Sequence, residues 1–256
     1  MNPARGPWID LHTHILPGVD DGAADVQDAL AMARLAEADG VRHILATPHV
    51  PFCGIPVKAL EERLKAFRAL LAENRVDVQV SLGTEISLEP DIVQWLADGT
   101  ARPLGSARYV LVELPFFGYP PYVEDVIFQL QVQGYRPIFA HPERNAELAA
   151  TPARMGPLVE RGVLAQITTT SLLGGFGTAA RNAATEFLQR GWAHVLASDA
   201  HSATHRPPLL SEGVRAAEKI VGEAAWDLVS VNPAAILNGD EVEAPRPVKK
   251  TRRWLR

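Results

Sequence analysis

The sequence predicts a single α/β domain built as a barrel of about seven β–α units. Short apolar runs alternate with amphipathic helical patterns along the chain, as in repeated β–α units around a parallel sheet. The 256 residues are 47% hydrophobic, which is enough for one substantial core, and no linker-like stretch occurs before residue 240. These observations favour one barrel over an open sheet or two small domains.

The strands are expected where short apolar runs occur. They are residues 8–11, 44–46, 78–82, 109–112, 137–140, 163–167 and 194–197. The first helix follows Asp25, a candidate N-cap, and should end at Gly40. A second amphipathic helix is indicated by Val57, Leu60, Leu64, Phe67 and Leu71, which recur every three or four residues. Further helices are expected at 124–133, 153–161, 178–190, 208–221 and around 232–239.

Composition excludes several classes of protein. The formal net charge of −5 provides no overall positive field for binding nucleic acid. The single cysteine, Cys53, excludes a disulfide framework and a thiolate zinc site, and suits a reducing compartment. We find no signal-peptide pattern and no run of eighteen apolar residues, so a cytoplasmic location is predicted.

The end of the chain differs from the rest. We expect residues 1–240 to form the barrel and residues 241–256 to form a basic C-terminal tail. A solvated terminus is the favoured interpretation of this tail. The alternative is contact with a membrane surface or partner through Lys249, Lys250, Arg252, Arg253 and Trp254.

Ionisable residues stand directly after almost every expected strand. They are His12, His14, His49, Glu85, Glu113, His141, Asp199 and His201, and the first β–α loop adds Asp20 and Asp21. The carboxyl ends of barrel strands share one face, so these residues should converge there. Any one of them alone could be a hydrogen-bonded residue without a role. His43 and His194 open their strands and are interpreted as structural, while His205 is left unassigned.

The number and type of these side chains predict a multinuclear metal site. Five imidazoles and at least four carboxylates are too many for one ion and enough for two or three. Mixed nitrogen and oxygen donors favour Mn²⁺, Zn²⁺ or Fe²⁺ over Mg²⁺ and Ca²⁺.

Several motifs at these positions resemble a known family. Residues 10–22 read DLHTHILPGVDDG, and further matches are residues 46–49, 83–86, 112–114, 140–144, 197–201 and 206–208. They resemble the PHP (polymerase and histidinol phosphatase) superfamily, and within it the bacterial manganese-dependent protein-tyrosine phosphatases of capsular and exopolysaccharide synthesis. The resemblance extends from about residue 8 to residue 239.

The resemblance implies a fold, a metal cluster and a substrate. The fold is a PHP-type distorted (β/α)7 barrel, and up to three ions, Mn²⁺ first, are implied. His12, His14 and Asp199 would hold the first, with Glu85 bridging to a second that Glu113 and His141 complete; Asp21, His49 and His201 would hold the third. Asp20 is the less favoured member of its pair. The implied substrate is a phosphotyrosine protein, a bacterial tyrosine kinase of polysaccharide biosynthesis.

Two loops depart from the family pattern. Residues 50–56 (VPFCGIP) lack the expected polar, often basic character, and residues 174–177 (GGFG) have glycine where a basic residue is common. Both loops are expected near the substrate entrance, so they bear on the substrate more than on the reaction.

Two arginines are candidates for binding the phosphoryl group. Arg144 follows His141 by three residues and Arg206 follows His201 by five, and a guanidinium matches phosphate geometry. The alternative for each is a surface salt bridge. The sequence identifies no general acid, and tyrosinate, with a phenolic pKa near 10, leaves without a strong one.

Other functions remain as alternatives. A cysteine-based tyrosine phosphatase is excluded because the position six after Cys53 is Ala59 rather than arginine. A histidinol-phosphate phosphatase is the main enzymatic alternative, followed by a nuclease-like phosphodiesterase. An amidohydrolase would need a carbamylated lysine where Glu85 stands. The alternative of another class is a non-catalytic regulator that binds phosphoproteins.

Overall fold

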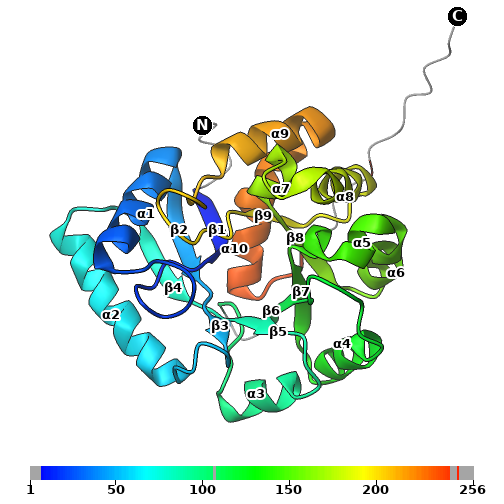
Figure 1. The fold of residues 1–256 in the computed structure, drawn as a ribbon, viewed down its shortest axis with the longest axis horizontal. Helices are drawn as coiled ribbons and strands as arrows, with labels where there is room; N and C mark the ends of the chain where they lie inside the picture. Colours follow the sequence, from blue (N-terminus) through cyan, green and yellow to red (C-terminus); the bar gives the residue numbers. More distant parts are fainter. Residues whose placement is uncertain (1–6, 106–107, 243–246, 248–256) are drawn as a thin grey trace, which may run out of the picture.

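The structure, a computed structural model, describes residues 7–105, 108–242 and 247. Its strands lie around the centre, most helices surround them, and α10 (Val231–Asn238) lies in the middle of the view (Figure 1). The strands are β1 (Trp8–Thr13), β2 (Val41–Ala46), β3 (His49–Val50), β4 (Gln79–Leu82), β5 (Glu85–Ser87), β6 (Tyr109–Glu113), β7 (Arg136–Ala140), β8 (Leu164–Thr168) and β9 (Val195–Ala197). The prediction of an α/β barrel is confirmed.

All strand pairs in the described chain are parallel and form two sheets. One has the order β1-β2-β4 and the other β3-β5-β6-β7-β8-β9. Two residues separate β2 from β3, and two separate β4 from β5, so these short strands continue the predicted second and third strands around the barrel. The sequence did not predict these interruptions.

The barrel closes between its first and last strands. A parallel bridge joins Thr13 to Ala200, and the His14 N–H donates to the Ala200 carbonyl at 2.8 Å. The Asp199 N–H donates to the His12 carbonyl at 2.9 Å. The seam is therefore made by the two segments that carry the paired motifs.

Most predicted helices are present. They are α1 (Val26–Asp39), α2 (Val57–Glu73), α4 (Val123–Val132), α6 (Met155–Glu160), α8 (Gly177–Arg190), α9 (Ser211–Val221) and α10 (Val231–Asn238). At α1, the Asp25 carboxylate accepts from the Asp28 N–H at 2.9 Å, and Gly40 ends the helix with φ 105°. The N-cap at Asp25 and the helix end at Gly40 both agree with the sequence prediction.

The helix predictions were incomplete in places. Short helices α3 (Ile92–Asp98), α5 (Ala146–Ala150) and α7 (Thr169–Leu173) and the 3-10 segments η2 (Pro142–Arg144) and η4 (Gly222–Val229) were not predicted. The helix expected over 153–161 begins as the 3-10 segment η3 (Pro152–Arg154) and continues as α6. The helix expected over 208–221 begins only at Ser211. The Asp39 carboxylate, at the end of α1, accepts from the N–H groups of Leu210 and Ser211 at 2.7 and 2.8 Å. A remote residue thus caps α9, which local sequence could not reveal.

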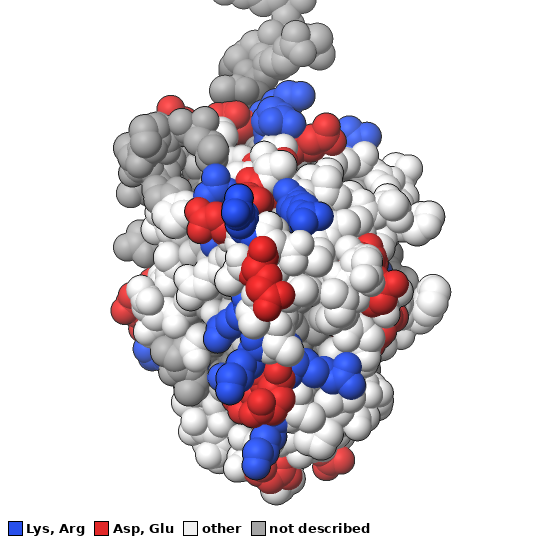
Figure 2. All heavy atoms as spheres, turned by 90° about the vertical axis from the view of Figure 1, so that its left-hand side faces the viewer, with Lys and Arg blue, Asp and Glu red and all other residues white. Residues whose placement is uncertain are grey.

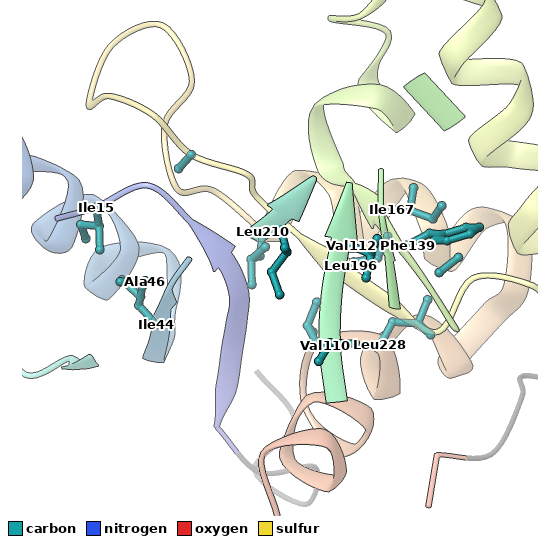
Figure 3. Close-up of a cluster of buried hydrophobic side chains, with 14 of the residues drawn as sticks. Ile15, Ile44, Ala46, Val110, Val112, Phe139, Ile167, Leu196, Leu210 and Leu228 are labelled. Atoms are coloured by element: carbon teal, nitrogen blue, oxygen red, sulfur yellow. The ribbon is translucent and has the colours of Figure 1, made fainter. Parts of the chain in front are cut away.

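Two apolar cores stabilise the barrel. The smaller lies inside it and includes Leu11, Leu45, Leu111 and Ile138, with Ile236 of α10. The larger lies between the strands and the surrounding helices. In Figure 3, Val110, Val112, Phe139, Ile167 and Leu196 lie together with Leu228 of η4. Alternate residues of each strand therefore serve different cores.

The segment 211–238, which contains α9, η4 and α10, is long and apolar enough to span a membrane by length and composition alone. Its side chains Val214, Ala217, Leu228 and Ile236 are buried in the domain. In its most apolar 18-residue window, 39% is buried, so the segment packs against the core on one side and is exposed in part. Residues 243–246 and 248–256, which hold the basic part of the predicted tail, lie outside the described residues.

One face of the molecule, on the side of α1 and α2, carries charges of both signs. Figure 2 shows Lys and Arg interspersed with Asp and Glu over this face. Such mixing produces no extended field of one sign there.

Candidate metal centre

The interior of the barrel changes from apolar to polar along its strands. On β6 the inward row passes from Leu111 to Glu113, and on β8 from Leu164 to Gln166. After β9 the row passes from Ala197 to Asp199. The same alternation that builds the inner core therefore delivers polar side chains to the carboxyl ends of the strands.

Two residues leave their strands in a left-handed conformation. His141 has φ 32° and Asp199 has φ 52°. Residues other than glycine rarely adopt this backbone conformation, which costs on the order of 1–3 kcal/mol. Both side chains turn into the same basin, so backbone strain is concentrated where the ionisable groups converge.

Four overlapping groups of metal-binding side chains fill this basin. They are His12–His14–Asp199, His12–Glu85–His141, His49–Glu85–Glu113 and His14–Asp21–His49–His201, with donor atoms of each group within 4.8 Å of one another. All nine side chains that the sequence singled out as ligands occur in these groups. The structure thus brings together residues up to 189 positions apart in the sequence.

Glu85 lies at the centre of the groups. Its Oε2 is 3.1 Å from His12 Nε2 and 3.2 Å from both His14 Nε2 and His49 Nδ1, while Oε1 is 3.1 Å from His141 Nε2. Glu85 is fully buried, and Oε2 has no hydrogen-bond partner. Burial alone would raise the pKa of Glu85, but the imidazoles, His12 first, hold it well below its usual range. A buried, ionised oxygen among ring nitrogens fits a shared cation ligand.

Two other side chains orient the imidazoles. His12 Nδ1 is 2.9 Å from Gln166 Oε1, and His14 Nδ1 is 2.7 Å from Asp20 Oδ2. In each ring Nε2 is left to face Glu85 and Asp199. Such contacts behind a ligand fix its tautomer and its direction.

Sequence reasoning missed Gln166, and it predicted no supporting role for Asp20. The sequence favours Asp21 over Asp20 as a ligand, and Asp20 belongs to none of the four groups. Burial would raise the pKa of Asp20, but its bonds to His14 and to backbone N–H groups lower it to about 2. Gln166 lies on the inward-facing row of β8, two residues after Leu164. This alternation is the signal in the sequence that could have identified it.

The outer group lies at the edge of the basin. Asp21 Oδ1 is 3.4 Å from both His49 Nε2 and His201 Nε2, and Asp21 is 65% exposed. Burial, together with the nearby His14, lowers the pKa of His201 to about 4. His201 is therefore neutral at pH 7, the form in which imidazole binds a metal.

The two candidate arginines meet at Asp199. Arg144 Nη1 donates to Asp199 Oδ2 at 2.7 Å, and Arg206 Nη2 donates to the same oxygen. Phe176 lies against both guanidinium groups, with its ring centroid 4.2 Å from Arg144 Cζ and 5.5 Å from Arg206 Cζ. Since Asp199 is buried, these are not surface ion pairs, the alternative considered for them.

The balance of charge in the basin favours cations. Asp20, Asp21, Glu85, Glu113 and Asp199 bring five carboxyl groups, and Arg144 and Arg206 bring two positive charges. Burial, together with the Glu85 carboxylate, raises the pKa of Glu113 to about 8. The pKa values of His12 and His14 are also raised, so without ions the crowded carboxyl groups hold protons in the basin. Divalent ions would take the place of these protons. The mixed nitrogen and oxygen donors fit Mn²⁺, Zn²⁺ or Fe²⁺.

Two further carboxyl groups are buried beside the basin. Asp10 Oδ1 accepts from the Ser198 N–H at 3.0 Å and so ties β1 to the end of β9. Glu143 Oε1 accepts from the Thr168 N–H at 3.0 Å. Burial raises the pKa of Asp10 to about 6 and that of Glu143 to about 7. The sequence predicts no role for either group.

The remaining histidines lie apart from the four groups. His43 Nε2 is 2.8 Å from Ser81 Oγ, and His194 Nδ1 accepts from the Ala165 N–H at 3.1 Å. These contacts support the structural interpretation of both residues. His205 is exposed, and its backbone N–H donates to Ser202 Oγ at 2.9 Å.

The basin opens to a cavity of about 380 Å³. Its lining residues are Asp20, Asp21, His49, Phe52, Cys53, Ser87 and Glu113. Burial raises the pKa of the Cys53 thiol, so this group is protonated at neutral pH and is a poor nucleophile.

Known proteins with similar sequences are tyrosine phosphatases. The chain is 35% identical over 247 residues to the tyrosine-protein phosphatase YwqE of Bacillus subtilis, covering 94% of this chain and 97% of YwqE. It is 32% identical to the putative tyrosine-protein phosphatase CapC of Staphylococcus aureus (80% and 81% covered). Identity to CpsB of Streptococcus pneumoniae is 27% (90% and 98% covered).

Solved structures agree in fold. A chain from a study of YwqE and CpsB, described as unique metal-dependent tyrosine phosphatases, superposes with a TM-score of 0.87 at 35% identity, covering 94% of this chain and all of the other. The lactonase Lmo2620 of Listeria monocytogenes, at 13% identity and a TM-score of 0.59, covers 92% and 95% and shares the fold alone. Residues 8–238 match the family described as "Capsular polysaccharide synthesis, CpsB/CapC". The chain belongs to this family, as the resemblance of its motifs predicted.

Proposed function

We propose that this chain is a metal-dependent protein-tyrosine phosphatase that holds up to three divalent ions, Mn²⁺ first, in the basin at the carboxyl ends of its strands. The main support for this proposal is the position of Glu85 Oε2. This buried oxygen has no hydrogen bond and lies within 3.2 Å of three imidazole nitrogens. The metal dependence and activity named for the similar YwqE and CpsB structures support the proposal.

We assign the nine candidate ligands to three ion positions. His12, His14 and Asp199 would hold the first ion, and Glu85 would be shared with a second position completed by Glu113 and His141. Asp21, His49 and His201 would hold the third. Bound ions supply a nucleophile at neutral pH and neutralise charge on the phosphoryl group.

Arg144 and Arg206 are proposed to bind the phosphoryl oxygens. Both guanidinium groups already bond one carboxylate oxygen, and a phosphoryl oxygen is an acceptor of the same kind. Phe176 keeps the two groups side by side at the rim. With tyrosinate as the leaving group, the oxygen departs without a strong general acid, so the chain needs no further proton donor.

The substrate protein is proposed to be a bacterial tyrosine kinase of polysaccharide biosynthesis, met in the cytoplasm. The family description, which names capsular polysaccharide synthesis, supports this assignment. The absence of disulfide-forming pairs, with Cys53 as the single cysteine, is consistent with a reducing compartment.

The first test is phosphate release by chelator-stripped protein before and after Mn²⁺ is added. A phosphotyrosine peptide, a phosphoserine peptide and histidinol phosphate are compared, and Zn²⁺ and Fe²⁺ are tested in parallel. We expect Mn²⁺ to restore turnover of the phosphotyrosine peptide in preference to the other two. Preference for histidinol phosphate would replace the substrate assignment, and inactivity of the metal-loaded protein on all three would overturn the proposed function.

A further inference from the structure

A second cleft, of about 210 Å³, lies beside the metal centre. Its lining residues are Phe52, Ser87, Leu88, Glu89, Glu113, Leu114, Pro115, Phe116 and Tyr122. Phe52, Ser87 and Glu113 also line the larger cavity over the basin. A group seated in this cleft would therefore adjoin both the basin and a proposed metal ligand.

The walls of the cleft are aromatic and come from three different segments. Phe52 follows β3, Phe116 follows β6, and Tyr122 precedes α4. Phe52 is 63% exposed and Phe116 is 43% exposed. Phe52 meets Trp95 edge-on with centroids 6.4 Å apart, and Phe116 stacks on His141 at 6.0 Å. Exposed aromatic groups that converge on a cleft are typical of a binding site for an apolar group.

Phe116 connects the cleft to Arg144, one of the two arginines proposed to bind the phosphoryl group. Arg144 Cζ lies 4.7 Å from the ring centroid of Phe116, so the guanidinium packs against a residue that also lines the cleft. In a phosphotyrosine a single oxygen joins the phosphorus to the ring. A phosphoryl group held by Arg144 would thus place its ring beside Phe116.

Charge determines which end of a substrate can enter the cleft. Glu89 and Glu113 both line it, and the residues that line it include no lysine or arginine. The Glu89 carboxylate, with no cation beside it in the lining, disfavours a phosphate dianion there, while an uncharged ring experiences no such repulsion. At about 210 Å³, the cleft is also below the ~300–1,000 Å³ of pockets that hold drug-sized ligands, and it suits a single ring.

We propose that this cleft receives the aromatic ring of phosphotyrosine and that Phe52 determines the preference for aryl over alkyl phosphoesters. The inference rests on the proposed function and assigns the side of the site that the leaving group occupies. Phe52 lines both the cleft and the larger cavity, so its removal would take away an aromatic contact at the point where the two meet.

The test compares binding of two non-hydrolysable probes to the Mn²⁺-loaded full chain by calorimetry. Phenylphosphonate carries the ring, and methylphosphonate carries the same charged group without it. Wild-type protein should bind phenylphosphonate more tightly, and Phe52→Ala should weaken that binding by about tenfold, the effect of losing one aromatic contact. Methylphosphonate binding should change by less than about twofold, because the phosphonate contacts are untouched.

Phe128→Ala is the matched control. Phe128 lies on α4, is 61% exposed and does not line the cleft, so this variant should bind both probes like wild type. Phe52→Tyr should retain the preference for phenylphosphonate. Equal affinity of wild type for the two probes, or an equal loss of both in Phe52→Ala, would overturn the ring assignment. The readout is binding, so it decides this point even if the turnover assay refutes the phosphatase proposal.

Discussion

The two ends of the barrel each bury a histidine, and the pKa values of these two histidines shift in opposite directions. His194, at the amino end, and His12, at the carboxyl end, are both buried. Burial lowers the pKa of His194 to about 4. Burial acts in the same direction on His12, but the carboxylates of Glu85 and Asp199 outweigh it and raise the pKa of His12.

The difference shows that burial alone does not make a functional histidine. His194 accepts a hydrogen bond from a backbone N–H and is satisfied as a neutral side chain. His12 has Gln166 behind it and two carboxylates in front, an arrangement that favours a positive charge, either a proton or a metal ion, between the ring and the carboxylates. One end of the barrel is therefore built for stability and the other for ion binding.

The strongest test of the carboxyl end is Glu85→Gln. The change keeps the shape but removes the charge that four imidazoles face. We expect bound metal to be lost and kcat/KM on phosphotyrosine to fall on the order of 10³-fold. Elemental analysis and steady-state kinetics measure the two effects. Full metal content with normal activity would remove Glu85 from the centre of the site.

Arg206→Ala tests the phosphoryl contact separately from the ions. Loss of one charge-assisted contact should lower kcat/KM by about 10²-fold while metal content stays the same. Arg190→Ala is the control, since Arg190 pairs with Glu186 on the exposed side of α8. An Arg206 variant with the kinetics of wild type would exclude this residue from the reaction.

Asp20→Asn tests the support behind the ligands. The variant keeps a side chain of the same size at His14 Nδ1 but removes the carboxylate. Metal affinity should fall by roughly 10–100-fold, as measured by titration with Mn²⁺. Asp98→Asn, at an exposed position, provides a comparison. Unchanged affinity would show that Asp20 only shapes its loop.

At the amino end of the barrel, His194 leads to a prediction about stability. The folded-state pKa of His194, about 4, lies below its ordinary value of 6.5, so the unfolded chain binds the extra proton between these pH values. The free energy of unfolding should therefore fall as pH falls through this window, with a contribution of roughly 3 kcal/mol from this group. Denaturant titrations of metal-free protein at several pH values measure it.

His194→Gln should flatten this pH dependence relative to wild type. His205→Gln, at an exposed position, should leave it unchanged. The same slope in all three proteins would contradict the assignment of the effect to His194.

Sequence predicted the parts of the molecule that local patterns determine. Apolar runs located the seven main strands, and the residues after them proved to be neighbours in space. What sequence missed depends on contacts between distant segments. The cap that Asp39 provides to α9, the support of His12 by Gln166 and the stacking of Phe176 on two arginines each join separate elements. Periodicity can place Gln166 on the inward row of β8, but spacing along the chain does not identify the distant partner in any of these contacts.

The seam between β1 and the end of β9 has a consequence for synthesis of the protein. His12 and His14 leave the ribosome early, whereas Asp199 and Ala200, which bond to their backbones, leave about 190 residues later. The first ion position is therefore incomplete until most of the chain has been made. Ions that bind only the closed barrel would then favour its closure by mass action, so that metal supply would contribute to the yield of folded protein.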